Sequence, residues 1–325
     1  LDNLKPILQS EKLKKIGHNL KYDRNVLVKY NINLVGIEHD SMLLSYVYDS
    51  TAIRHGLDNA AEKYLSHKTI HYEDVAGKGA KQIPFADVDI DIAAEYACED
   101  AVISLELYNF LWSKVSKDKN IVKVYSDIEM PLVPILSKIE TNGVLIDSKA
   151  LQKLSKDLNK ELNELESKCF KITNREFNLN SPKQLQEILY DELKIPVSKK
   201  TPTGKPSTDE DTLQFLAQTN ELPKLILEYR SLNKLKTGYT DKLPLQISKT
   251  SGRVHTSYQQ AITSTGRLSS TDPNLQNIPI KTSKGKKIRK TFIAQGEKRI
   301  FAADYSQIEL RIMAHLSEDK NLLKA

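Results

Sequence analysis

The clearest hydrophobic pattern in the chain lies between residues 147 and 173. Apolar side chains recur there every three or four residues, which is the spacing of one face of an α-helix. These positions are Leu151, Leu154, Leu158, Leu162, Leu165 and Cys169. Asp147 stands immediately before them and is a suitable N-cap. The pattern predicts a long amphipathic helix with a narrow apolar seam, packed antiparallel against a second helix.

Weaker patterns predict further helices on both sides of this one. Helical spacing is found at residues 53–65, 92–115 and 222–236, and another helical stretch begins at Met130. A loop is expected at residues 77–79, and Asn142-Gly143 marks a turn. After residue 252 the sequence changes to short strands and turns rich in Thr, Ser, Asn and Gln. We therefore expect domains at residues 1–115, 116–250 and 251–325.

The amino-acid composition favours a globular protein over a membrane protein or a disulfide-rich one. Of 325 residues, 39% are hydrophobic and 28% are charged, as in a soluble globular protein, and no apolar run approaches the ~20 residues that span a bilayer. No signal peptide is recognisable, and the two cysteines, Cys98 and Cys169, offer neither a disulfide framework nor a metal-binding spacing. A reducing, cytosolic setting is the default expectation.

Charge is distributed unevenly along the chain. Residues 1–115 hold 13 Lys and Arg against 17 Asp and Glu, a net charge of −4. Residues 251–300 hold 10 against 2, a net charge of +8. This asymmetry suggests an acidic module joined to a surface that meets polyanions, although a solvated charged surface would give the same counts.

Candidate chemistry is concentrated near the C-terminal end. An apolar run over residues 299–303 ends in Asp304, and helical spacing resumes at Ile308, which predicts the order strand, aspartate, helix. An aspartate at the end of a core strand can hold Mg²⁺ together with substrate phosphates. Spacing alone leaves a second possibility open, because Asp304 could cap the helix and Ser306-x-x-Glu309 is a capping box.

The amino-acid sequence of this segment also resembles a known family. Asp304-Tyr-Ser-Gln-Ile-Glu-Leu-Arg311 resembles the first palm motif of family A DNA polymerases, especially the bacterial members. The resemblance implies that Asp304 binds both ions of a magnesium pair and that the Tyr305 backbone helps to coordinate one. It also implies that Glu309 blocks the ribose 2′ position, and that Tyr305, Ser306 and Gln307 belong with Glu309 to the nucleotide-binding segment.

Residues 263–279 resemble the same family over nearly their whole length. The resemblance implies that Arg267 contacts the primer terminus and that Asn274, Gln276 and Asn277 face the duplex. Such donors can test the shape of a base pair from the minor groove without reading its sequence. A polar turn around Asp272-Pro273-Asn274 is the alternative.

Two basic segments fit a nucleic-acid partner. Residues 281–290 hold six Lys and Arg in ten, which suits phosphate neutralisation. Lys281, however, stands where relatives commonly carry arginine, which puts a specific phosphate role for it in doubt. Residues 120–250 resemble the polymerase thumb, where Arg230 and Lys234 are four residues apart and could contact one DNA strand. A solvated helix face is the alternative for either residue alone.

The N-terminal part resembles a 3′–5′ exonuclease. Residues 17–23 and 96–100 resemble the second and third exonuclease motifs, which implies that Asp23 and Asp100 bind Mg²⁺, Mn²⁺ or Zn²⁺. Tyr96 would then orient the nucleophile, and Asn19 would support the site. Helical spacing puts Tyr96 and Asp100 on one face, in a stripe expected to face the core. Without the family, a buried and hydrogen-bonded aspartate would explain Asp100 equally well.

The family also carries an Asp-x-Glu pair upstream of Asp23 and a second catalytic aspartate beyond Asp304, and neither is found in this sequence. We therefore expect the chain to be an internal section of a longer polymerase. The expected fold is multidomain α/β: the C-terminal part of a ribonuclease H-like exonuclease domain, a helical thumb and the first part of an α+β palm.

The expected function, in the parent protein, is template-directed transfer of deoxynucleotides to a primer 3′-OH by two Mg²⁺ ions, with associated 3′–5′ proofreading. Expected partners are primer–template DNA and deoxynucleoside triphosphates, with no membrane. The protein is expected to be a monomer in the bacterial cytoplasm. Two alternatives stay open, namely a DNA-binding fragment without catalysis and a stand-alone exonuclease.

Overall fold

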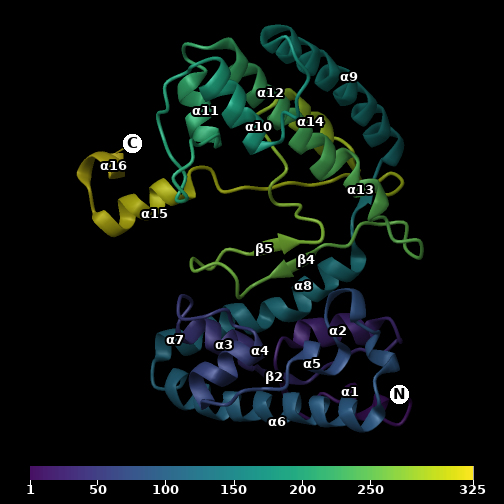
Figure 1. Ribbon diagram of the computed structural model, residues 1–325. Helices are drawn as coiled ribbons and strands as arrows, with labels where there is room; N and C mark the ends of the chain where they lie inside the picture. Colours follow the sequence, from purple (N-terminus) through teal and green to yellow (C-terminus); the bar gives the residue numbers. More distant parts are fainter. Residues whose placement is uncertain (325) are drawn as a thin grey trace.

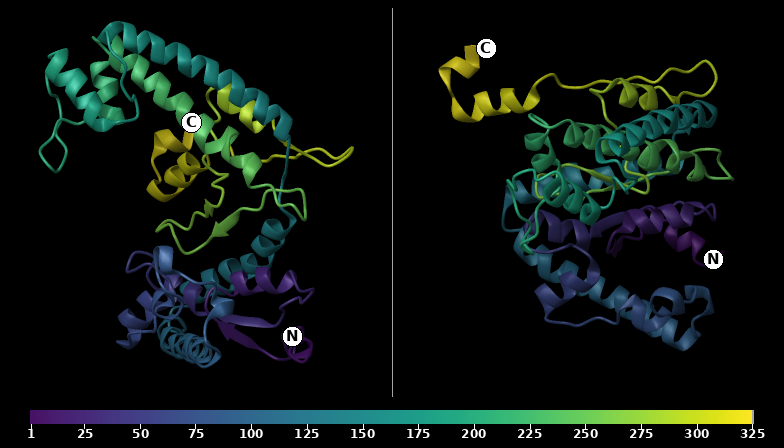
Figure 2. Two further views of the ribbon diagram at one scale, coloured as in Figure 1. Left: turned by 45° about the vertical axis from the view of Figure 1, so that its right-hand side comes forward. Right: turned by 45° about the horizontal axis from the view of Figure 1, so that its top comes forward.

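The computed structural model describes residues 1–324 and contains two helical bodies with a β-hairpin between them (Figures 1 and 2). Each body has its own hydrophobic core. One core is built from residues between Leu43 and Val133, and the other from residues between Ile146 and Ile288. Within residues 1–324, no helix is both long enough and apolar enough to cross a bilayer.

The first body contains a two-stranded parallel sheet of β1 and β2, in which Lys15 pairs with Ile37 and Gly17 with Asp40. Its main packing is between α3 and α6, where Leu43, Leu44, Leu107 and Leu111 are fully buried. The elements are α1 Lys5–Leu8, β1 Lys15–Gly17, α2 Leu20–Val28, β2 Ile37–Asp40, α3 Ser41–Tyr48, α4 Leu57–Ala60, the π-helix η1 Ala61–Leu65, α5 Tyr72–Ala76, the 3₁₀ turns η2 Gly79–Lys81 and η3 Phe85–Asp87, α6 Ile90–Val115, α7 Lys119–Val124 and the π-helix η4 Tyr125–Glu129.

Helix α8 Met130–Asn142 leads to the rest of the chain, which contains the hairpin and the second body, and whose two small sheets are antiparallel and pair β3 with β6 and β4 with β5. Its further elements are β3 Leu145–Ile146, α9 Ser148–Thr173, α10 Pro182–Gln186, η5 Glu187–Glu192, α11 Glu210–Leu216, α12 Glu221–Leu235, η6 Lys236–Thr240, α13 Lys242–Leu245, β4 Ser257–Gln259, β5 Ser269–Thr271, α14 Ser283–Arg289, β6 Phe292–Ile293, α15 Ile308–Ser317 and α16 Lys320–Lys324.

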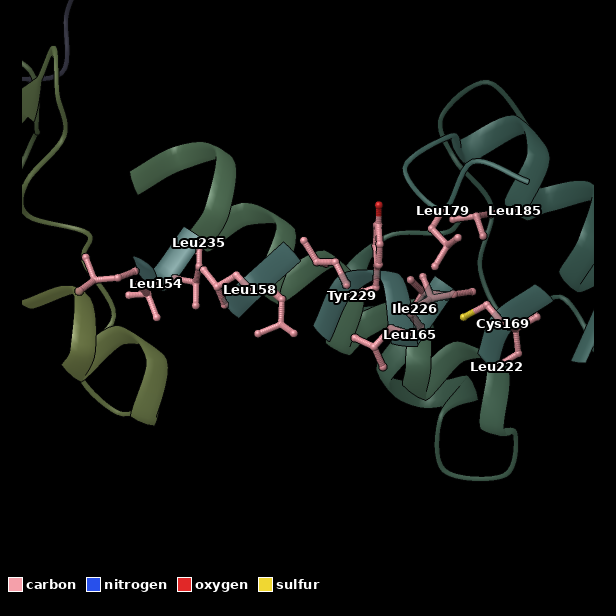
Figure 3. Close-up of a cluster of buried hydrophobic side chains, with 14 of the residues drawn as sticks. Leu154, Leu158, Leu165, Cys169, Leu179, Leu185, Leu222, Ile226, Tyr229 and Leu235 are labelled. Atoms are coloured by element: carbon pink, nitrogen blue, oxygen red, sulfur yellow. The ribbon is translucent and has the colours of Figure 1, made fainter. Parts of the chain in front are cut away.

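The predicted amphipathic helix is confirmed as α9. The Asp147 carboxylate accepts a hydrogen bond from the Ala150 amide at 2.9 Å, and all six seam positions are buried. The partner is α12, and the pair is antiparallel, because Leu154 lies near Leu235 at one end of the seam while Cys169 lies near Leu222 at the other (Figure 3). The predicted helices at 92–115, 222–236 and from Met130 are also found, whereas the stretch at 53–65 becomes helical only from Leu57.

The strand expected at residues 299–304 is wrong. These residues form no regular element, and the Phe301 side chain is 90% exposed. A strand is stabilised by the hydrogen bonds of a neighbouring strand, and no strand within residues 1–324 pairs with this segment. The helix that follows does begin near the expected place, at Ile308, but its N-cap is Gln307 in a left-handed conformation without a side-chain hydrogen bond. The Ser306–Glu309 capping box is therefore not formed.

Candidate functional site

The β4–β5 hairpin presents the loop that contains Arg267. Ser257 pairs with Thr271 and Gln259 with Ser269, so residues 260–268 form the connection between the two strands. The Arg267 guanidinium meets the Glu309 carboxylate of α15 at 2.6 Å, and the two side chains are 73% and 74% exposed. An exposed pair of this kind contributes little stability. Its importance is positional, because it joins two separately identified segments and leaves both side chains open to a ligand.

The remaining residues of the palm-like segment lie around the start of α15. Asp304, Tyr305, Ser306 and Gln307 are all exposed, and Gln307 turns the backbone into the helix with φ 52°. No side-chain hydrogen bond involves Asp304 within the described chain. Its carboxylate is therefore available to a cation from solvent, as a hard oxygen ligand suited to Mg²⁺.

The three duplex-facing candidates after β5 lie in a turn. The Asn274 side chain accepts hydrogen bonds from the amides of Gln276 and Asn277, at 3.1 and 3.2 Å. Asn274 therefore closes the polar turn that the sequence offered as its alternative role. The Gln276 and Asn277 side chains are exposed, while the Asn277 carbonyl is held by the Tyr239 hydroxyl at 2.7 Å.

Arg230 and Lys234 of α12 line one crevice of about 320 Å³ together with Asn277. Arg230 also donates a hydrogen bond to the Thr208 carbonyl at 2.6 Å, and burial lowers the pKa of its guanidinium. It thus holds the end of an irregular segment at residues 198–208, which lies between η5 and α11, against α12. The sequence did not suggest this structural role. Within residues 1–324 the Lys234 ammonium makes no hydrogen bond or ion pair, so Lys234 is the freer of the two cations.

The exonuclease-like residues lie on α2 and α6. Asn19 precedes α2, Asp23 lies in its first turn, and Tyr96 and Asp100 lie one turn apart on α6. Desolvation raises the pKa of Asp23, with a further contribution from Asp40. Desolvation also raises the pKa of Asp100, and that of Tyr96 to about 12, where the Asp100 charge adds to the effect.

The expectation that Asp100 lies within a core-facing stripe needs correction. Ser104, Leu107 and Leu111 of α6 are buried, but Ala97 is exposed and Asp100 is only half-buried. No side chain of α6 between residues 90 and 102 is buried, and the Tyr96 ring there packs against the rings of Tyr72 and Phe85. Asp100 is consequently at the edge of the core, where solvent can reach it.

Sequence reasoning missed Asp40, which is fully buried. Its carboxylate accepts hydrogen bonds from the amides of Asn19 and Leu20 at the start of α2, and from Met42 and Leu43 at the start of α3. One side chain thereby caps two helices. An Asp40-Ser41 pair directly before the apolar run 42–44 was the signal that could have identified it.

The oxygen ligands of this region suit a hard cation. The Asn19 Oδ1 atom is buried without a hydrogen-bond partner, and a nearby cation would lower the raised pKa values of Asp23 and Asp100. Within residues 1–324, no group of three or more His, Cys, Asp or Glu side chains is arranged to hold a metal ion. Asp23 is instead influenced by Asp40, and Asp100 by Asp58 and Glu99.

Comparison with known families agrees with this arrangement of segments. The model of "DNA polymerase family A" matches residues 148–325, which is more than half of the chain. The chain belongs to DNA polymerase family A. A second family model, "3'-5' exonuclease", matches residues 1–116. The resemblance stated from the motifs is thus confirmed, as is the fold class that combines exonuclease and polymerase domains.

Individual relatives match over the whole chain. DNA polymerase I of Pseudomonas aeruginosa is 53% identical over 325 residues, covering 99% of this chain and 36% of the relative. DNA polymerase I of Rhizobium leguminosarum is 43% identical, covering 100% of this chain and 32% of the relative. The chain spans about a third of the length of these curated relatives.

A solved structure shares the fold. It is described as the "POL domain of Pol1 from M. smegmatis complex with DNA primer-template and dNTP", and it is 32% identical with a TM-score of 0.83. The match covers 100% of this chain and 53% of that one. The arrangement of helices and hairpin described above is therefore that of a polymerase domain.

Proposed function

We propose that this chain is the central part of a template-directed DNA polymerase that joins deoxynucleotides to a primer 3′-OH. The observation that supports this most directly is the family match over residues 148–325, which contains both polymerase-like segments. The contact between Arg267 and Glu309 supports it further, because it brings these segments together in space. The proposed substrates are primer–template DNA and deoxynucleoside triphosphates, the molecules named for the M. smegmatis structure.

In the proposed site Asp304 and the Tyr305 carbonyl would hold Mg²⁺. Bound there, two such ions would stabilise the attacking 3′ oxygen and the leaving pyrophosphate. Glu309 would exclude a ribose 2′-OH, and Ser306 and Gln307 would border the nucleotide. Arg267 would contact the primer terminus from the minor groove, as its exposed guanidinium allows.

The second activity that we assign to the parent protein is 3′–5′ proofreading. Asp23 and Asp100 would bind Mg²⁺, Mn²⁺ or Zn²⁺, Tyr96 would orient the attacking water, and Asn19 would use its unpaired Oδ1 atom to support the site. The support is the family match over residues 1–116 together with the desolvated carboxyls of Asp23 and Asp100.

The proposal also covers the domain boundaries, the DNA contacts, the oligomeric state and the cellular location. The domains would be an exonuclease part at 1–115, a thumb at 116–250 and the start of a palm at 251–325. Duplex phosphates would be contacted by Arg230 and Lys234, and the duplex face would include Asn274, Gln276 and Asn277. The parent protein would act as a monomer in the bacterial cytoplasm.

The deciding experiment is primer extension by the full-length protein that contains this sequence. Extension of a labelled primer should require template, nucleotides and Mg²⁺, and Asp304→Ala should abolish it. Unchanged extension by Asp304→Ala would refute the metal role. Digestion of single-stranded DNA, lost in Asp23→Ala and Asp100→Ala but kept in Asp304→Ala, would establish proofreading separately. The same extension assay on the 325-residue chain alone distinguishes a catalytic section from a fragment that only binds DNA.

A further inference from the structure

The loop that contains Arg267 is held by a residue from the other end of the chain. The Tyr46 hydroxyl of α3 donates a hydrogen bond to the Thr263 carbonyl at 2.7 Å and accepts one from the Gly266 amide at 3.0 Å. It therefore closes both sides of a four-residue turn, across more than two hundred residues of sequence. Tyr46 itself is buried, and its ring meets the edge of His55 at a centroid distance of 5.5 Å, so its position is fixed by packing.

The turn leads directly to the Arg267 backbone. Gly266 has φ +80°, in the left-handed region, and the Thr263 hydroxyl donates to the Arg267 carbonyl at 2.6 Å. Tyr46 thus fixes the two ends of a turn whose next residue carries the exposed guanidinium. Ser50 adds a weaker contact through its hydroxyl, which donates to the Ser264 carbonyl at 3.1 Å.

These hydrogen bonds are not backed by close packing. A cavity of about 520 Å³ lies beside these contacts, lined by residues of α3, α7 and the loop that include Tyr46, Ser264 and Gly266. Where side chains do not fill the space around a loop, its conformation depends on a few directed contacts. The loop is also anchored at its base, where the buried Gln260 side chain donates to the Glu129 carboxylate at 2.6 Å. Tyr46 is the corresponding anchor at its tip.

We infer that Tyr46, a residue of the exonuclease-like body, is a positioning residue for the polymerase reaction. It holds the 263–266 turn so that Arg267 is directed toward the primer terminus before DNA binds. This inference rests on the role given to Arg267 in the proposed function. It adds that the precision of that contact is supplied by α3, through one hydroxyl group.

A fixed position of Arg267 should affect the extension of matched and mismatched primer ends to different extents. A matched terminal pair presents its minor-groove acceptors at the same places whatever its sequence, whereas a mismatch displaces them. A guanidinium that is held in advance gains most from a matched end. Loosening the turn should therefore slow extension of matched ends more than extension of mismatched ends.

The test uses full-length polymerase containing this sequence, with Tyr46→Phe compared against Tyr48→Phe. The control removes a hydroxyl from the same helix, and the ring of Tyr48, which contacts Tyr64, is retained. For Tyr46→Phe we expect kcat/KM for a matched primer to fall about tenfold, less than the loss of about 100-fold that a displacement of about 1 Å can cause. For a terminal mismatch the fall should be less than about threefold, because the contact with Arg267 contributes little there. Melting temperature and primer–template affinity should stay close to those of the wild type.

A double-mutant comparison tests whether Tyr46 affects the reaction through Arg267. If Tyr46 acts through Arg267, then Tyr46→Phe should have no further effect in an Arg267→Ala background. Ser50→Ala provides a second, milder variant at the same turn, with the same dependence on Arg267. Equal losses on matched and mismatched ends, or full additivity with Arg267→Ala, would overturn the inference. Failure of the wild-type enzyme to extend any primer would instead refute the proposed function, so the two outcomes are distinguishable.

Discussion

A buried ion pair makes the sharpest stability prediction. The Lys21 ammonium of α2 meets the Glu140 carboxylate of α8 at 2.6 Å, and their side chains are only 6% and 5% exposed. Glu140 also accepts hydrogen bonds from the Asn25 side chain and, at 2.6 Å, from the Tyr258 amide of β4. One carboxylate thus joins the first body, the connecting helix and the hairpin.

Removing Glu140 should lower the free energy of unfolding more than removing Lys21. Glu140→Gln leaves the Lys21 charge buried without a counter-ion, and breaking a buried pair in this way costs about 3–5 kcal/mol. Lys21→Met removes the cation instead, and Glu140 keeps its donors from Asn25 and Tyr258. Because hydrogen bonds to a charged group contribute about 1.5–3 kcal/mol each, we expect this variant to lose only about 1–3 kcal/mol. The double variant should lose less than the sum of the two, by at least about 1 kcal/mol.

Urea unfolding of the chain can be followed by the fluorescence of Trp112, its single tryptophan, which packs among aromatic residues of the first body. Glu129→Gln is a matched control, because this buried carboxyl has a raised pKa from desolvation and is held by Gln260. Its neutralisation should change the free energy of unfolding by less than about 1 kcal/mol. The reasoning fails if Glu140→Gln costs no more than this control, or if the losses of the single variants simply add.

Three further predictions use other features. The pKa values of His18, His39 and His55 are lowered by burial, so the folded state keeps these rings neutral while the unfolded state takes up protons below about pH 6.5. The free energy of unfolding should therefore be fully maintained above that pH and decline from pH 6.5 to 5, and an unchanged urea midpoint would contradict this. Leu158→Ala, in the fully buried seam of α9, should cost roughly 2–5 kcal/mol in the same measurement, whereas a loss below 1 kcal/mol would mean that the seam is not tightly packed. Lys234→Ala should weaken duplex binding at low salt and reduce the slope of log affinity against log salt by about 1, and an unchanged slope would exclude a phosphate contact.

The parts of the fold that were predicted from sequence depend on local information. The six seam positions of α9 and the cap at Asp147 are set by spacing and by one side chain, so both could be identified in advance. The segment before Asp304 is the opposite case. Its apolar residues resemble a strand, but a strand depends on partners elsewhere in the chain, and Phe301 is exposed within the described residues.

In the candidate site too, some features could be predicted from the sequence and others could not. Sequence motifs identified Arg267 and Glu309 separately. The spacing of residues along the chain could not indicate that these two form an ion pair. Nor could it indicate that Arg230 would be engaged by the Thr208 carbonyl. Such contacts depend on how distant elements pack, which sequence periodicity does not report.

The anchoring of the β4–β5 hairpin gives the first body a structural role apart from the proposed proofreading. A two-stranded hairpin is marginally stable alone, and this one is attached at Tyr258 through Glu140, at Gln260 through Glu129 and at its tip through Tyr46. Those attaching residues are distinct from the four proposed for proofreading on α2 and α6. An exonuclease-inactive variant should therefore keep the hairpin in place, while a variant of an attaching residue should disturb polymerisation and leave the proofreading residues intact. Attachment of the hairpin and the proposed proofreading should therefore be separable by mutation, because they use residues of different elements.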